Sequence, residues 1–176
     1  ADDIILRNIT EKWTWGNFDK KRLHVDRAYG PSLQTMRLVM IRAGRQMIAD
    51  GKNDAAIQLA DQYFEAFPFF NFPPDQFAAL MADIYARAGA KDKAAKIARE
   101  MIPHLAQVVR FYDSQPARFK EGYRQDYRFA TAAAQTLMRT AAQLEDDALS
   151  KELMGVLGSS IQGNMPSFED IPEDGQ

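Results

Sequence analysis

The sequence predicts an all-α protein, organised as a stack of antiparallel helix hairpins that forms an α-α superhelix. Three observations lead to this expectation. Apolar residues recur every three or four positions over long stretches, turn-forming glycines and prolines separate these stretches, and one helix-turn-helix pattern occurs twice. A chain of 176 residues is long enough to form one domain with a substantial core.

The composition excludes several classes of function. The chain has 22 basic and 24 acidic residues, so it has no overall positive field that would attract nucleic acid or an anionic membrane. It has no cysteine, which excludes disulfides, thiol catalysis and thiolate metal sites and fits either the cytosol or the periplasm. No apolar run approaches the roughly 18 residues that a membrane span requires. No signal peptide is recognisable at the first residues, as expected for a mature chain or for a piece of a longer protein.

Residues 1–30 are expected to form an irregular lead-in that docks on the helical body. The lead-in contains the turn-forming sequences WTWGN and Gly30-Pro31 and shows no clean periodicity. Trp13 and Trp15 favour docking over an exposed partner-binding pair, because each indole can bury about 200 Å².

Helical periodicity begins near Ser32 and ends at Asp50-Gly51, a typical helix stop. A second helix is expected from Asn53, with an acidic first turn that suits the positive helix end, and Pro68 ends it. The same pattern returns 38 residues later, where Gly89 matches Gly51 and Ala94 matches Ala56. The chain therefore repeats a helix-turn-helix unit.

These residues resemble the tetratricopeptide repeat family, whose unit is two antiparallel helices with small residues where they cross and a period of about 34 residues. Gly44 and Ala82 occupy matching crossing positions, whereas Met40 and Ala78 stand where the family usually has tryptophan. The expected repeat domain covers residues 31–158, with units at about 37–70 and 75–108 and an atypical third hairpin at 116–158. Residues 159–176 are expected to be a flexible acidic tail.

A proline-rich joint, FPFFNFPPDQF at residues 67–77, separates the first two units. Its prolines restrict the backbone and remove donors, so it cannot be helical. Phe69, Phe70 and Phe72 either fill the wedge between hairpins or form an exposed aromatic platform for a ligand, and the residues favour core packing.

The sequence contains no recognisable catalytic pattern. His24 and His104 lie in different regions, and no phosphate loop, nucleophile elbow or zinc-protease signature occurs. Residues 110–128 mix basic and aromatic side chains, but acidic residues interrupt them and their spacing suits a helix face better than a base-stacking platform. We therefore expect no catalytic residue, metal, cofactor or nucleic-acid partner.

A wider resemblance covers roughly residues 9–145. The order of WTWGN, LHVDRAY, GKNDAAIQLADQYFEAFP, the joint and YARAGAKDKAAKIA is similar to the C-terminal region of a family of bacterial polytopic membrane proteins of unknown function. That family resembles protein O-mannosyltransferases. The resemblance implies a soluble, non-catalytic domain attached to a membrane glycosyltransferase-like part, on the periplasmic face of the inner membrane; the residues alone leave a cytoplasmic location open.

The predicted function is a helical-repeat interaction module that holds a polypeptide segment or another subunit, and the alternative is a small-ligand or glycan-binding domain. In the resembling repeat family the first helix of each unit lines the concave face. Transferring that geometry predicts a groove in which Arg45 and Arg87 bind a carboxylate and Asp83 orients Arg87 across one helical turn. The alternative is an ordinary solvated helix face. The complete predicted groove is Leu38, Ile41, Arg45, Ile48, Gln76, Asp83 and Arg87.

Overall fold

The all-α prediction is confirmed. The computed structural model describes residues 2–24 and 27–157, and within them the chain forms seven α-helices, one short 3-10 helix and no strand. The predicted acidic tail at 159–176 lies outside the described residues. In chain order the elements are α1 (Asp2–Glu11), η1 (Arg27–Tyr29), α2 (Gly30–Ala49), α3 (Asn53–Ala66), α4 (Gln76–Arg87), α5 (Lys91–Ser114), α6 (Ala117–Leu144) and α7 (Asp147–Leu157).

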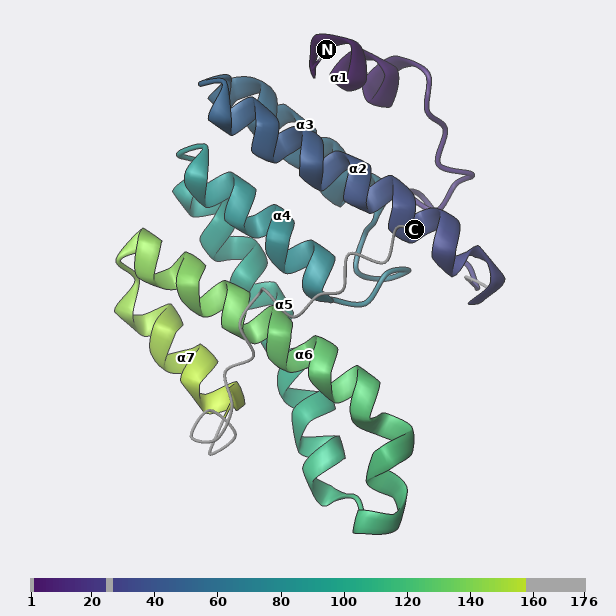
Figure 1. Cartoon of the computed structure of the whole chain (residues 1–176), viewed down its shortest axis with the longest axis vertical. Coiled ribbons are helices and arrows are strands. Elements are labelled where there is room, and N and C mark those ends of the chain that lie inside the picture. Colours follow the sequence, from purple (N-terminus) through teal and green to yellow (C-terminus); the bar gives the residue numbers. More distant parts are fainter. Residues whose placement is uncertain (1, 25–26, 158–176) are drawn as a thin grey trace, which may run out of the picture.

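The helices from α2 onward pack as consecutive hairpins, α2 with α3, α4 with α5 and α6 with α7 (Figure 1). The first helices of the three hairpins also contact one another in order, α2 with α4 and α4 with α6. Gly51 and Gly89 adopt φ of +74° and +91° in the turns of the first two hairpins, a conformation that favours glycine. Glu145 takes the left-handed conformation in the third turn, where the chain has no glycine.

Small residues let the hairpins approach closely. A Cβ atom at Gly44 would lie 2.8 Å from Ile84 Cδ1 and 3.5 Å from Leu59 Cδ2, so this glycine sits where three helices meet. Helices α4 and α6 contribute many alanines to one apolar cluster, together with Leu137: Ala78, Ala79 and Ala82 on α4 and Ala130, Ala133, Ala134 and Ala141 on α6.

The prediction of an irregular lead-in is partly wrong, because residues 2–11 form the helix α1. Ile9 of α1 is only 1% exposed in the core, and α1 contacts both α2 and α3. Trp13 and Trp15 pack against the same core, with the Trp15 ring centre 5.4 Å from that of Phe67. The segment after α1 therefore docks on the body, as its tryptophans indicate.

Asn71 holds this segment against the joint. Its Nδ2 group donates to the carbonyl oxygens of Phe18 at 2.7 Å and Lys21 at 2.6 Å. Its Oδ1 atom accepts from the amide of Leu23 at 2.8 Å. One side chain of the joint thus satisfies three backbone groups about 50 residues earlier in the chain.

The joint connects α3 to α4 as a non-helical turn, and its phenylalanines divide between core and surface. Phe72 is 8% exposed and belongs to the core, Phe69 is half-buried, and Phe70 is 48% exposed. The structure does not gather the three rings into one exposed platform, because Phe72 points into the core, where its ring centre lies 5.1 Å from that of Phe67.

The second hairpin is longer than expected. The predicted unit ends near residue 108, whereas α5 continues through Pro103 to Ser114 and α6 begins only at Ala117. Residues 104–114 of α5 and 117–130 of α6 form a two-helix projection that extends beyond α4 and α7 (Figure 1). We call this projection the α5–α6 arm.

Candidate functional site

A hollow of about 270 Å³ lies on the face made by the first helices of the three hairpins. Its lining includes three arginines, one from each helix: Arg45 of α2, Arg87 of α4 and Arg139 of α6. We call it the three-arginine hollow. Leu80, Asp83, Thr136 and Gln143 complete the lining.

Helical spacing explains how each helix supplies its residues. Leu80, Asp83 and Arg87 are three and four residues apart on α4, so they lie along one helix face. Residues 136, 139 and 143 follow the same spacing on α6. Because α4 packs against α6, the two faces lie close enough to share one hollow.

Asp83 orients one of the three cations. Its Oδ2 atom lies 2.8 Å from Arg87 Nε, and the Asp83 side chain is 13% exposed whereas that of Arg87 is 56% exposed. A half-buried carboxylate thus binds the Nε group of an exposed guanidinium. The described lining thus combines three guanidinium groups with one carboxylate, and a guanidinium can bind carboxylate or phosphate oxygens through paired donors.

The structure brings together Arg45, Asp83 and Arg87 of the predicted groove. Ile41 was wrongly included, because it is 2% exposed in the core and cannot touch a partner. Ile48 is half-buried against the same core. Two further predicted residues, exposed Leu38 and half-buried Gln76, do not line the hollow.

The contribution of α6 was not predicted from the sequence. Thr136, Arg139 and Gln143 belong to the third hairpin, which lacks the glycine turn used to align the first two units. Their spacing of three and four residues was an available signal, but only the register of α6 against α4 shows that they face the predicted arginines.

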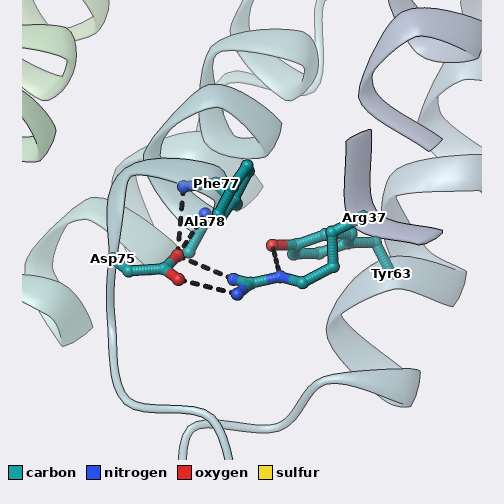
Figure 2. A network of polar contacts seen from close by, with 5 residues as sticks. All are labelled: Arg37, Tyr63, Asp75, Phe77 and Ala78. Atoms are coloured by element: carbon teal, nitrogen blue, oxygen red, sulfur yellow. Dashed lines mark hydrogen bonds and ion pairs between the residues drawn. The ribbon is translucent and has the colours of Figure 1, made fainter. Parts of the chain in front are cut away.

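A buried ion pair fixes the helices that carry this site (Figure 2). Arg37 of α2 donates from Nη1 to Asp75 Oδ2 at 2.6 Å and from Nη2 to Asp75 Oδ1 at 2.7 Å. Its Nε donates to the hydroxyl of Tyr63 at 2.7 Å. The guanidinium therefore ties α2 to α3 and to the start of α4.

Asp75 also begins α4. Its Oδ1 atom accepts from the backbone amides of Phe77 at 3.0 Å and Ala78 at 3.1 Å, which satisfies two donors of the first turn. The guanidinium of Arg37 lies 4.8 Å from the ring centre of Phe77. One carboxylate thus serves both as the helix cap and as the partner of a buried cation.

Burial and pairing change the pKa of Arg37 in opposite directions. Burial lowers the pKa of Arg37, but its interactions with Tyr63 and Asp75, including hydrogen bonds to both, together raise it by more, so it lies above the ordinary arginine value. Burial likewise raises the pKa of Tyr63, although the neighbouring Arg37 charge opposes this. Both groups keep their protons throughout the physiological range, and we assign them a structural role.

Arg37 follows the buried spacing of Met40, Ile41 and Gly44, and this spacing was the signal in the sequence that could have predicted its burial.

The described part of the chain contains no group of three or more His, Asp or Glu side chains arranged to hold a metal ion. None of its helices is long and apolar enough to cross a membrane. No family model, curated protein or solved structure matches the chain.

Proposed function

We propose that this chain is a tetratricopeptide-repeat-like interaction module that holds an acidic segment of another polypeptide or subunit in the three-arginine hollow. The observation that carries the proposal is the convergence of Arg45, Arg87 and Arg139 from the first helices of successive hairpins. A helix stack places such residues on one continuous face, where an extended segment can contact several hairpins at once.

The volume of the hollow favours a peptide over a free small ligand. At about 270 Å³ it is smaller than the roughly 300–1,000 Å³ typical of small-molecule sites. A carboxylate side chain or a chain-terminal carboxylate fits this space, with the rest of the peptide lying along the neighbouring helix faces. A glycan or another small anionic ligand is the second candidate, supported by Thr136 and Gln143 as hydrogen-bonding groups in the lining.

A peptide titration tests this function. Fluorescein-labelled ten-residue peptides with aspartate and glutamate, and matched peptides with asparagine and glutamine, are titrated with the full chain and followed by anisotropy. Reversing Arg45 and Arg87 to glutamate should weaken the acidic peptide at least tenfold, equivalent to about 1.4 kcal/mol, and circular dichroism checks that the variant remains helical.

The matched control reverses two exposed arginines outside the hollow, Arg42 and Arg110. This control changes the net charge by the same amount and should leave affinity within twofold. Equal losses in both double variants would mean diffuse attraction and reject the hollow as a site. Binding of a panel of acidic monosaccharides, with no response to either peptide, would favour the second candidate.

We further propose that the chain is the soluble C-terminal part of a membrane glycosyltransferase-like protein, located at the periplasmic face of the inner membrane. The proposal rests on the resemblance carried by WTWGN and the proline joint. The reading frame upstream of this segment tests it. A gene that encodes no hydrophobic spans before this chain would reject the membrane attachment and leave the interaction module unaffected.

A further inference from the structure

A second concave surface runs along the α5–α6 arm, away from the three-arginine hollow. It has a volume of about 540 Å³, and Pro73 and Pro74 of the joint contribute to its lining. Four aromatic rings dominate its lining, Phe111 and Tyr112 from α5 and Tyr123 and Phe129 from α6. We call it the aromatic groove.

The exposure of these rings follows from helix length. The arm extends past the start of α4 and past the end of α7, so neither neighbour covers it (Figure 1). Phe111 remains 47% exposed, Phe129 41% and Tyr123 39%. A single exposed ring is ordinary on a protein surface, but several rings lining one groove mark a binding surface.

The rings of the groove are organised before any partner arrives. Phe111 meets Tyr123 edge to face at 5.0 Å between ring centres, and Tyr112 stacks on Tyr127 at 4.1 Å. These contacts join the two helices of the arm. A partner therefore meets rings that are already positioned, which lowers the entropy cost of binding.

The charge of the groove selects the partner. Among the described residues, its lining includes two carboxylates, Asp75 and Asp126, and neither lysine nor arginine. Asp75 already pairs with Arg37 and caps α4, whereas Asp126 is exposed on α6. Burial lowers the pKa of His104, the histidine of the lining, so this side chain is neutral at pH 7 and does not offset the carboxylates.

The arm contains two cations that lie over aromatic rings, one ring inside the groove lining and one outside it. The Lys120 ammonium lies 5.0 Å from the ring centre of Tyr112, and the Arg118 guanidinium lies 4.7 Å from that of Phe119. A cation over an aromatic face is attracted by the negative face of the ring. Rings beside a carboxylate therefore suit a basic side chain with an apolar stem.

We propose that the aromatic groove binds a short segment of another polypeptide in which a lysine or arginine stands beside large apolar side chains. The apolar side chains pack between Val108, Phe111 and Phe129, and the basic group lies beside Asp126. Residues 104–112 of α5 run for roughly 12 Å at about 1.5 Å per residue, which accommodates about two turns of helix. This surface is separate from the three-arginine hollow and opposite to it in charge preference.

The test uses two amidated, fluorescein-labelled ten-residue peptides of leucine and phenylalanine, one with lysines at the polar positions and one with glutamates. Anisotropy titration with the full chain should show binding of the lysine peptide and at least tenfold weaker binding of the glutamate peptide. Asp126→Asn should weaken the lysine peptide at least fivefold. Glu121→Gln, which removes a carboxylate of α6 outside the groove, should leave it within twofold.

A second pair of variants tests the apolar contact. Phe129→Ala should weaken the lysine peptide at least tenfold, and Phe119→Ala, an exposed ring outside the groove lining, should not. Reversal of Arg45 and Arg87 should have no effect, which separates this surface from the hollow. Equal binding of both peptides, or equal losses in Asp126→Asn and Glu121→Gln, would overturn the proposal. Sedimentation showing a dimer that Phe129→Ala dissociates would also overturn it, because a second copy would then occupy the groove.

Discussion

Removing the carboxylate of Asp75 should destabilise the protein more than removing the cation it binds. Asp75→Ala abolishes the cap on α4, which costs about 1 kcal/mol, and leaves Arg37 charged in the core. Breaking a buried ion pair costs about 3–5 kcal/mol, but the Asp75 side chain is 30% exposed and water can reach the vacated site. We therefore assign about 2 kcal/mol to the unpaired cation, which makes about 3 kcal/mol in total.

Replacing Arg37 with Met has a smaller expected effect. The apolar side chain fills similar space, Asp75 keeps its two amide donors, and its carboxylate is partly hydrated. The main loss is the hydrogen bond to the buried hydroxyl of Tyr63, which costs about 1–2 kcal/mol. Combining Arg37→Met with Asp75→Ser, which retains a capping oxygen, should give nearly the same stability as Arg37→Met alone.

Urea unfolding followed by circular dichroism measures these differences, with the slope of the transition used to verify that each variant unfolds as the parent does. In a thermal unfolding experiment, Asp75→Ala should lower the melting temperature by about 6–12 °C, given roughly 2–4 °C per kcal/mol for a chain of this size. The decisive comparison is the double variant, which should be more stable than Asp75→Ala. If the double variant is the least stable of the three, the ion pair is net stabilising beyond its capping role and the reasoning is wrong.

Three other perturbations follow from the same structure. Phe72→Ala should destabilise by about 3 kcal/mol because its ring is buried, and exposed Phe70→Ala by well under 1 kcal/mol, as measured by urea unfolding; equal effects would contradict the division of the joint into core and surface. His104 should titrate below the ordinary value of about 6.5 in a proton NMR titration, and Asp75→Asn should lower its pKa further because the Asp75 charge opposes the effect of burial. Its contribution to stability is then complete above about pH 6.5 and is lost as the pH falls toward the folded pKa, so a His104 pKa above 6.5 would refute the argument. Asn71→Ala should raise proteolytic cleavage between residues 16 and 24 at least fivefold, since it frees three backbone groups; an unchanged digestion pattern would show that the tryptophans alone hold the segment.

The hairpin architecture could be predicted because its signals are local. Gly51 and Gly89 mark turns that need positive φ, and the apolar spacing of three and four residues marks the buried faces. The helix α1 was missed because only Ile5, Leu6 and Ile9 carry its stripe, and a ten-residue helix depends on packing against its neighbours more than on its own propensity.

The candidate site could be predicted only in part, for a related reason. Arg45, Asp83 and Arg87 follow from aligning two similar units, whereas Arg139 lies in a hairpin that does not align with them. Ile41 was misassigned because a helix facing two neighbours buries a wider arc than a single stripe indicates. The aromatic groove depends on how far α5 continues beyond Pro103, and the proline is tolerated there at an exposed position of the helix.

Helix α4 determines which parts of the molecule can unfold independently. Met81, Ile84 and Tyr85 belong to one apolar cluster, with α2 and α3, while Ala78, Ala79 and Ala82 belong to the other, with α5, α6 and α7. Either end of the stack can open while α4 stays docked on the opposite half, but α4 itself can separate only when both clusters are lost. Its amide hydrogens should therefore exchange with solvent at the rate of global unfolding, and those of α1 and of the α5–α6 arm should exchange much faster through local opening.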